Sequence, residues 1–301
     1  MSGLTLPARR AGWNVHPERR RVTEGHALID AQRRLRAVLE RWLPQHRARL
    51  PHAAAQALHA TQRVLAQADS ATFRQSVADL RATLQRPGCS AATTGHALGV
   101  VGAAMTRTIG KTPYDTQYLA AWLILQGRLT EMATGEGKTL AAAIAAAVAA
   151  LGQVPVHLLT ANDYLVQRDS ETMAPFYAAL GLRVGCVLTP MTREQRVPAY
   201  RCDVTFVTAK ELVFDYLKDH LAQGGEHDPR VLRAHALRAH GAAPDGSTPE
   251  PAGGLLPGLH MAIVDEADAC LLDEAVTPLI LAQAGRPVNA QAYASAFAIT
   301  T

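Results

Sequence analysis

The run Gly135-Glu136-Gly137-Lys138-Thr139 contains residue types that can hold a polyphosphate and a divalent cation. Glycines let backbone N–H groups approach phosphate closely, and a helix that follows directs its positive end at the same anion. The lysine would neutralise the β and γ phosphates, and the threonine hydroxyl would reach Mg²⁺. The strict pattern GxxxxGK[ST] is incomplete, because Met132 stands at its first glycine. Together with Thr134, the loop TGEGKT predicts a site for ATP and Mg²⁺.

A second motif, Asp265-Glu266-Ala267-Asp268, directly follows the apolar run 260–264. An acid at the end of a strand can hold Mg²⁺, usually through water, and the adjacent glutamate can deprotonate the attacking water. Alone, the cluster could equally be a plain acidic helix start, since carboxylates stabilise helix N-termini. In one chain with the glycine loop it favours an ATPase site. Thr139 and Asp265 would hold Mg²⁺, and Lys138 and Glu266 would be the catalytic residues.

The elements that must position these residues change in type near residue 95. Residues 25–86 have helical spacing of apolar positions, as in Ala31–Leu43, and no strand-like alternation. Further helices are expected at about 53–67 and 71–85, the last ending before Pro87-Gly88. The first 95 residues therefore read as a helical amino-terminal region.

After residue 95, apolar strand candidates alternate with helical stretches. Strands are expected at 129–132, 154–160, 184–188, 203–208 and 261–265, and helices at 138–151, from Asn162 or Asp163 to Gly181, and from 208 to about 221. Strands alternating with helices predict an α/β fold with a mostly parallel sheet covered on both faces. Such sheets bind ligands at the carboxyl ends of their strands, which is where both chemical motifs lie.

Composition excludes several other classes of protein. Apolar residues make up 48% of the 301 residues and charged residues 19%, which permits a packed core. The four cysteines form no CxxC pair, so neither a disulfide framework nor a zinc ribbon is indicated. The first residues lack the apolar core of a signal peptide, and the longest apolar run, Leu140–Leu151, is too short to cross a bilayer. We expect a cytoplasmic protein.

Two segments depart from this pattern. Residues 1–50 hold eleven arginines, no lysine and four acidic residues, a net charge of +7. Such a segment can bind acidic lipid or nucleic acid, but charge alone favours a solvated helix face in an arginine-rich protein. Residues 222–259 are rich in Gly, Pro, Ala and His, and we predict a loose surface insertion there.

Five blocks in one order resemble the SecA family of protein-export ATPases. The blocks are Glu131-Met-Ala-Thr-Gly-Glu-Gly-Lys-Thr139 (EMxTGEGKT in the family), His157-Leu-Leu-Thr-Ala-Asn-Asp-Tyr-Leu165 followed by Arg168-Asp169 (HVVTVNDYLxxRD), Phe214-Asp-Tyr-Leu217 (FDYL), and Ile263–Asp268 with Leu272–Ile280 (IVDEVDSILIDEARTPLI). The match runs from about residue 95 to 282.

The resemblance implies a fold, a further site residue and partners. It implies a helicase-like, RecA-type P-loop domain. The family's adenine-contacting glutamine lies in a segment FDVQ that aligns with Tyr114–Gln117, which adds Gln117 to the nucleotide site. It also implies coupling of ATP hydrolysis to export of an unfolded preprotein through a SecYEG-type channel, and a location at the cytoplasmic side of the inner membrane. It strengthens the expectation that residues 1–50 meet acidic lipid.

The resemblance also divides the chain and marks departures from the family. It predicts a helical region at 1–95, a first nucleotide-binding domain at 96–282, and the start of a preprotein-binding insertion at 283–301. The second motor domain is not expected within this chain. Val276 replaces an arginine of DEARTPL, and Ala209-Lys210 replaces an asparagine pair. These departures indicate a divergent or incomplete member.

Two other functions share these motifs. A DEAD-type nucleic-acid helicase usually offers an arginine-bearing PTREL-like segment where this chain reads Thr160-Ala-Asn-Asp-Tyr-Leu165, so the sequence argues against nucleic acid as a partner. A non-hydrolysing nucleotide- or partner-binding module is the other alternative, because a lone first domain lacks the arginines that speed phosphoryl transfer.

Overall fold

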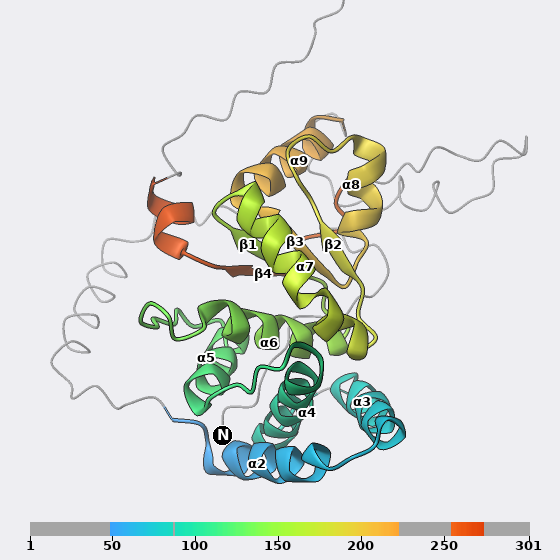
Figure 1. The fold of residues 1–301 in the computed structure, drawn as a ribbon. Helices are drawn as coiled ribbons and strands as arrows, with labels where there is room; N and C mark the ends of the chain where they lie inside the picture. The colour runs from blue at the N-terminus through green and yellow to red at the C-terminus, as the bar shows by residue number, and fades with distance from the viewer. Residues whose placement is uncertain (1–48, 87, 223–253, 274–301) are drawn as a thin grey trace, which may run out of the picture.

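The computed structural model describes residues 49–86, 88–222 and 254–273. Its elements, in chain order, are α2 (His52–Ala66), α3 (Ser70–Leu84), α4 (Ala91–Ile109), α5 (Asp115–Leu125), α6 (Lys138–Leu151), β1 (Val156–Thr160), α7 (Asp163–Ala179), β2 (Val184–Cys186), α8 (Arg193–Tyr200), β3 (Val204–Thr208), α9 (Ala209–Ala222), β4 (Met261–Val264) and a π-helical turn, η1 (Ala269–Asp273). Helices α2 to α4 lie at one end of the molecule and the sheet at the other, with α5 and α6 between them (Figure 1).

The four described strands form one parallel sheet in the order β2-β3-β1-β4. The register places Thr160 of β1 opposite Thr208 of β3, and Asp265, just after β4, donates its backbone N–H to Leu159 O over 2.9 Å. The carboxyl ends of these strands therefore meet at one edge, with the second chemical motif on it. The α/β fold class expected from the alternation of strands and helices is confirmed.

Side chains on the two faces of the sheet enter two separate apolar cores. Val156 and Leu158 of β1 pack in the larger core with residues of α6 and α7. Leu159, on the opposite face, packs with Tyr200 of α8 and Leu212 of α9. Alternation with a period of two is what a strand requires when helices cover both of its faces.

Helix α6 is the most deeply buried helix of the described part of the chain. Every residue from Ala141 to Leu151 is buried, and the helix packs against α5, α4 and the sheet. Its many alanines explain how this is possible, because small side chains let neighbouring backbones approach from all sides. The helix predicted at 138–151 is confirmed with the same bounds.

The predicted helices at 53–67 and 71–85 correspond to α2 and α3, each shifted by one residue. Asp69 caps α3 by accepting the N–H of Thr72 over 2.8 Å. Helix α4 runs across residue 95, the proposed start of the nucleotide domain, and packs closely against α2. The helix predicted at 31–43, residues 1–48 of the basic segment and residues 283–301 lie outside the described residues.

The strand predicted at 129–132 is wrong, because the segment is irregular and pairs with no strand of the described sheet. The segment follows the tight end of α5, and its Leu129 is 90% exposed, so this side chain enters no core. Three helices were not predicted, namely α4, α5 and α8. Most of the predicted insertion, residues 223–253, lies outside the described residues.

A buried ionic cluster joins α8, α9 and the loop after β2. The Arg196 guanidinium lies 2.6 Å from Asp215 and 2.7 Å from Glu211, and it also donates to the carbonyls of Leu188 and Thr189. Asp215 is fully buried and also accepts the Tyr200 hydroxyl over 2.9 Å. Because these buried charges have several hydrogen-bonding partners, they can fix the loop at this edge of the sheet without leaving an uncompensated charge.

Three helices end in the same hydrogen-bonded motif, but with different residues at its left-handed position. Gly127 after α5 and Gly181 after α7 have φ of 70° and 65°. After α6 the left-handed residue is Gln153, with φ of 63°, and the N–H groups of Gln153 and Val154 donate to Ala150 O and Ala149 O. A residue with a Cβ is destabilised in the left-handed backbone conformation, whereas glycine is not.

We expect Gln153→Gly to raise the free energy of unfolding by about 1 kcal/mol, because it removes this penalty at an exposed position. Urea denaturation followed by circular dichroism would measure the change. Gly127→Gln is the matched control, since a Cβ at Gly127 would meet nothing within 4 Å. It should lose a similar amount of stability. An unchanged or lowered stability of the Gln153 variant would contradict the expectation.

Candidate functional site

Gln117 joins α5 to the glycine loop. Its side-chain oxygen accepts the N–H of Tyr114 at the start of α5 over 3.1 Å, and its Nε2 donates to the backbone O of Glu136 over 2.7 Å. The side chain is buried, with 4% of the residue exposed. A primary amide carries two N–H donors, so one donor is left after these contacts. Gln117 thus lies in the predicted site and also orders the loop.

The glycine loop turns into α6 at Gly137, whose φ is 82°. The left-handed backbone favours glycine here, and a Cβ would displace Gln117 Nε2 from its hydrogen bond to Glu136. No side chain caps the N-terminus of α6, in contrast to α7, where Asn162 accepts the N–H of Leu165. The first N–H groups of α6 are therefore open to an anion.

Asp265 and Glu266 follow β4 at the carboxyl edge of the sheet. The N–H of Glu266 donates to Asp265 Oδ1 over 3.1 Å, and the backbone of Glu266 is left-handed, with φ of 55°. Burial, and then the charge of Glu266, raise the pKa of Asp265, while Lys138 lowers it. Asp169 of α7 also acts to raise it. The fold therefore brings the lysine of the first motif within electrostatic reach of the aspartate of the second.

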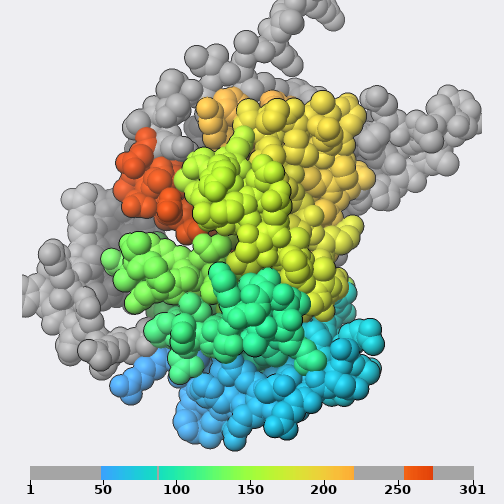
Figure 2. All heavy atoms as spheres, in the orientation of Figure 1, coloured from blue at the N-terminus to red at the C-terminus, as the bar shows by residue number. Residues whose placement is uncertain are grey.

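A cavity of about 770 Å³ lies between α5, the glycine loop and α7. Four of the residues predicted from sequence line it, namely Gln117, Gly135, Gly137 and Thr139. Thr134, Glu136, Lys138, Asp265 and Glu266 do not line it. In the space-filling view, the red segment after β4 and the lime start of α7 lie next to each other, above the green segment before α6 (Figure 2).

Three residues that line the cavity were given no role in the sequence analysis. Lys111 and Tyr114 precede α5, and Arg168 lies on the side of the cavity formed by α7. Arg168 donates from Nε and Nη2 to Asp169 Oδ1 over 2.8 and 2.7 Å, and Asp169 is 5% exposed. Arg168-Asp169 matches the RD that ends the family block HVVTVNDYLxxRD, and this match was the signal that could have identified the pair. An exposed aromatic ring, a guanidinium and an amide together suit a planar heterocycle.

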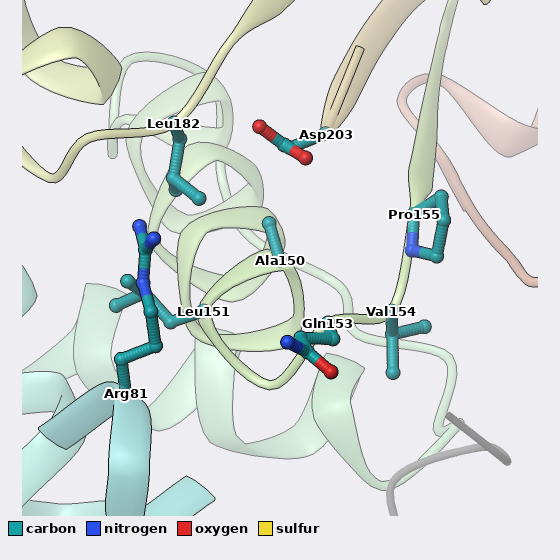
Figure 3. A pocket seen from close by; sticks show the side chains of 8 residues that line it. All are labelled: Arg81, Ala150, Leu151, Gln153, Val154, Pro155, Leu182 and Asp203. Carbon is teal, nitrogen blue, oxygen red and sulfur yellow. The ribbon is translucent and has the colours of Figure 1, made fainter. Parts of the chain in front are cut away.

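A smaller cavity, of about 280 Å³, lies at the other end of α6 (Figure 3). Arg81 reaches into this region from α3, and its Nη2 donates to the carbonyls of Leu180 and Gly181. Asp203 accepts the backbone N–H of Arg183 over 2.8 Å. Both charged groups at this cavity therefore have protein partners, and none of the predicted site residues lines it.

The residues present fit a magnesium nucleotide. Mg²⁺ keeps several waters and takes only one or two protein carboxylates together with phosphate oxygens. Asp265 supplies a carboxylate at the sheet edge and Thr139 a hydroxyl in the first turn of α6. The uncapped N-terminus of α6, with a glycine before it where a Cβ would collide, forms a cradle for phosphate.

Comparison with protein families finds one model that matches, the SecA DEAD-like domain, over residues 39–301. Among curated proteins, the chain is 42% identical to "Protein translocase subunit SecA 2" of Bordetella avium over 246 residues, which is 80% of this chain and 36% of that protein. It is 37% identical to "Protein translocase subunit SecA 3" of Magnetococcus marinus over 221 residues, 73% of this chain and 32% of that protein.

A third relative, "Protein translocase subunit SecA" of Clostridium kluyveri, is 43% identical over 190 residues, 63% of this chain and 20% of that protein. The chain thus spans about a third or less of the length of these relatives. Among the described residues, no helix has the length and apolar character needed to cross a bilayer.

The raised pKa of Asp265 predicts a stability cost in metal-free buffer. A carboxylate whose folded pKa exceeds its unfolded pKa, about 3.9, destabilises the native state progressively as pH rises through these two values. We expect Asp265→Asn to be more stable than the unsubstituted chain at pH 7, because the neutral amide carries no charge that burial and Glu266 would disfavour. The difference should be smaller at pH 4, close to the unfolded pKa, and should disappear only well below that pH, where the aspartate is protonated in both states.

Urea denaturation at pH 4 and pH 7 in the presence of EDTA would measure this difference. Asp273→Asn, at an exposed position of η1, is the control and should change little. A less stable Asp265→Asn variant at pH 7 would mean that the ionised carboxylate stabilises the fold.

Proposed function

The chain belongs to the SecA DEAD-like domain family, and on that premise we propose that it binds Mg-ATP between α5, α6 and α7 as the motor domain of a protein translocase. The observation that carries the proposal is the convergence of its two motifs. Lys138, at the start of α6, acts on the pKa of Asp265, which follows β4. A cation at an uncapped helix N-terminus, within electrostatic range of an acid at a strand end, suits phosphoryl chemistry.

Each site residue has a role in this proposal. Lys138 and the N–H groups of Gly135, Gly137 and the first turn of α6 bind phosphate, with Thr134 and Glu136 in the same loop. Thr139 and Asp265 hold Mg²⁺, which when bound neutralises charge on the phosphates. Glu266 orients the attacking water and takes its proton. These assignments are supported by the uncapped helix and by the motif positions.

The base of the nucleotide is proposed to lie toward α5. The remaining N–H of Gln117 would donate to adenine, whose edge offers acceptors. Tyr114 is 74% exposed and lines the same cavity, so its ring is free to stack on a planar base. Arg168 lines the α7 side, where its guanidinium can lie over the base.

A second protein lobe is proposed to close over the site. Tyr164, Leu271 and Leu272, near the carboxyl edge of the sheet, are 71%, 60% and 70% exposed. Large apolar side chains exposed beside a candidate site suit a partner surface. In this proposal the partner is a second motor domain, which would bring the arginines that phosphoryl transfer needs.

By analogy with the relatives named as translocase subunits, the proposed work of the motor is to move an unfolded protein through a SecYEG-type channel. The chain would then act at the cytoplasmic face of the inner membrane, with acidic lipid as a contact of its basic segment 1–50. Because the chain spans a minor part of each relative's length, these partners are proposals about the assembled motor.

Lys138→Ala should weaken binding of Mg-ADP and Mg-ATP at least tenfold. Hydrogen bonds to charged groups contribute about 1.5–3 kcal/mol, and 1.4 kcal/mol is a tenfold change in affinity. Isothermal titration calorimetry measures the effect directly. Lys210→Ala removes an exposed lysine at the start of α9 and is the matched control. Equal affinity of the Lys138 variant and the unsubstituted chain would remove the phosphate role.

Glu266→Gln should bind nucleotide within about twofold of the unsubstituted chain and show no ATP hydrolysis, because an amide cannot take the proton of water. Phosphate release under excess protein measures turnover, and Glu194→Gln, an exposed glutamate of α8, is the control. Turnover retained in the Glu266 variant would exclude this residue as the base. Nucleotide binding without turnover in the unsubstituted chain would mean either that hydrolysis needs the arginines of the second lobe or that the chain is a non-hydrolysing binding module.

A further inference from the structure

Glu136 makes a reciprocal contact with Ala133 inside the glycine loop. The backbone N–H of Glu136 donates to Ala133 O over 3.3 Å, and the N–H of Ala133 donates to the Glu136 carboxylate over 3.2 Å. We call this pair of hydrogen bonds the loop clasp. Between the two residues, Gly135 has φ of 84°, which is the conformation that the third residue of a type II turn requires.

A carboxylate in this position is unexpected for a phosphate site. Glu136 is exposed and lies directly before Gly137 and Lys138, so its charge would face the same region as the phosphates and repel them. Its side chain therefore needs a role other than phosphate binding. The clasp supplies one, because it uses the carboxylate as an acceptor for a backbone N–H of the loop.

The clasp is also connected to the rest of the site. The backbone O of Glu136 accepts Gln117 Nε2 over 2.7 Å, so Glu136 is held from α5 by its carbonyl and holds Ala133 by its side chain. A loop with two left-handed glycines is otherwise costly to order. A loop that is already ordered before nucleotide arrives binds more tightly, because less conformational freedom is lost on binding.

We propose that Glu136 is a positioning residue of the nucleotide site, and that the reach of its side chain, rather than its charge, holds the loop ready for phosphate. The inference rests on the proposed function, since the ligand it prepares for is the nucleotide proposed above. In this proposal the Glu136 carboxylate orders the loop, although its negative charge repels the phosphates.

Three substitutions at Glu136 distinguish the effect of side-chain length from the effect of charge. Glu136→Gln keeps the length and the acceptor oxygen and removes the charge. Glu136→Asp keeps the charge but is one methylene too short for the clasp, and Glu136→Ala removes both. Titration calorimetry with Mg-ADP should show the Gln variant within twofold of the unsubstituted chain or tighter. The Asp and Ala variants should each be weaker by about three- to tenfold.

A second measurement reads the clasp without nucleotide. Hydrogen–deuterium exchange of the peptide covering 131–137 in the free chain should be faster in the Asp and Ala variants and unchanged in the Gln variant. Glu131→Ala is the matched control, because Glu131 is an exposed acid of the same segment. It should change neither the affinity nor the exchange rate by more than twofold.

Two patterns overturn the clasp alone. If the unsubstituted chain binds Mg-ADP and the Asp variant matches it while the Gln variant matches Ala, charge rather than reach is what counts. If all four proteins bind and exchange alike, Glu136 positions nothing. A folded, unsubstituted chain that binds no nucleotide would overturn the proposed function and this role together, and is thereby distinguishable from either pattern.

Discussion

The burial of helix α6 constrains the rest of this structure. Residues 141–151 are buried, and the helix lies between the sheet and the amino-terminal helices (Figure 1). A helix packed on all sides cannot shift without breaking contacts throughout the core. Its first residue, Lys138, is therefore held in a defined place relative to β1 and β4. The nucleotide loop takes its position from this helix, which explains how a glycine-rich segment can form a site.

Charge is used in two different ways at the carboxyl edge of the sheet. In the cluster of Arg196, Asp215 and Glu211, buried charges of opposite sign satisfy one another and hold the loop after β2. At the candidate site, Asp265 lies with Glu266 and Asp169, and its pKa is raised. Acids left close together without full compensation cost stability. Such a cost is expected where a cation and a polyphosphate are to be bound.

The amino-terminal helices contribute to the site at a distance. Helix α4 packs on α2, on α6 and on α7, and Arg81 of α3 holds the carbonyls at the end of α7. Helix α7 in turn carries Arg168 and Asp169 at its other end. The helical region thus belongs to the same packed unit as the sheet, and it supports the two helices, α6 and α7, whose N-terminal halves border the cavity.

Short-range patterns in the sequence were sufficient for the fold class and for the two motifs. Short apolar runs located β1, β3 and β4, the alanine run located α6, and Asn162 and Gly181 marked the ends of α7. Helix ends and apolar runs depend on residues that are close together in the sequence, so they can be recognised without the tertiary structure. The apolar segment at 129–132 was misread as a strand, because whether an extended segment finds a partner depends on the rest of the sheet.

Tertiary structure alone decided which residues meet. It joined Gln117 to the backbone of Glu136, 19 residues away, and it placed Tyr114 and Arg168 on one cavity. It also raised the pKa of Asp265, chiefly by burying the carboxylate, with smaller and opposite effects from Asp169 and Lys138. No local pattern encodes these contacts, because they arise where separately formed elements pack. Residue type and spacing thus determined what chemistry the chain could do, and packing decided which side chains were brought together to do it.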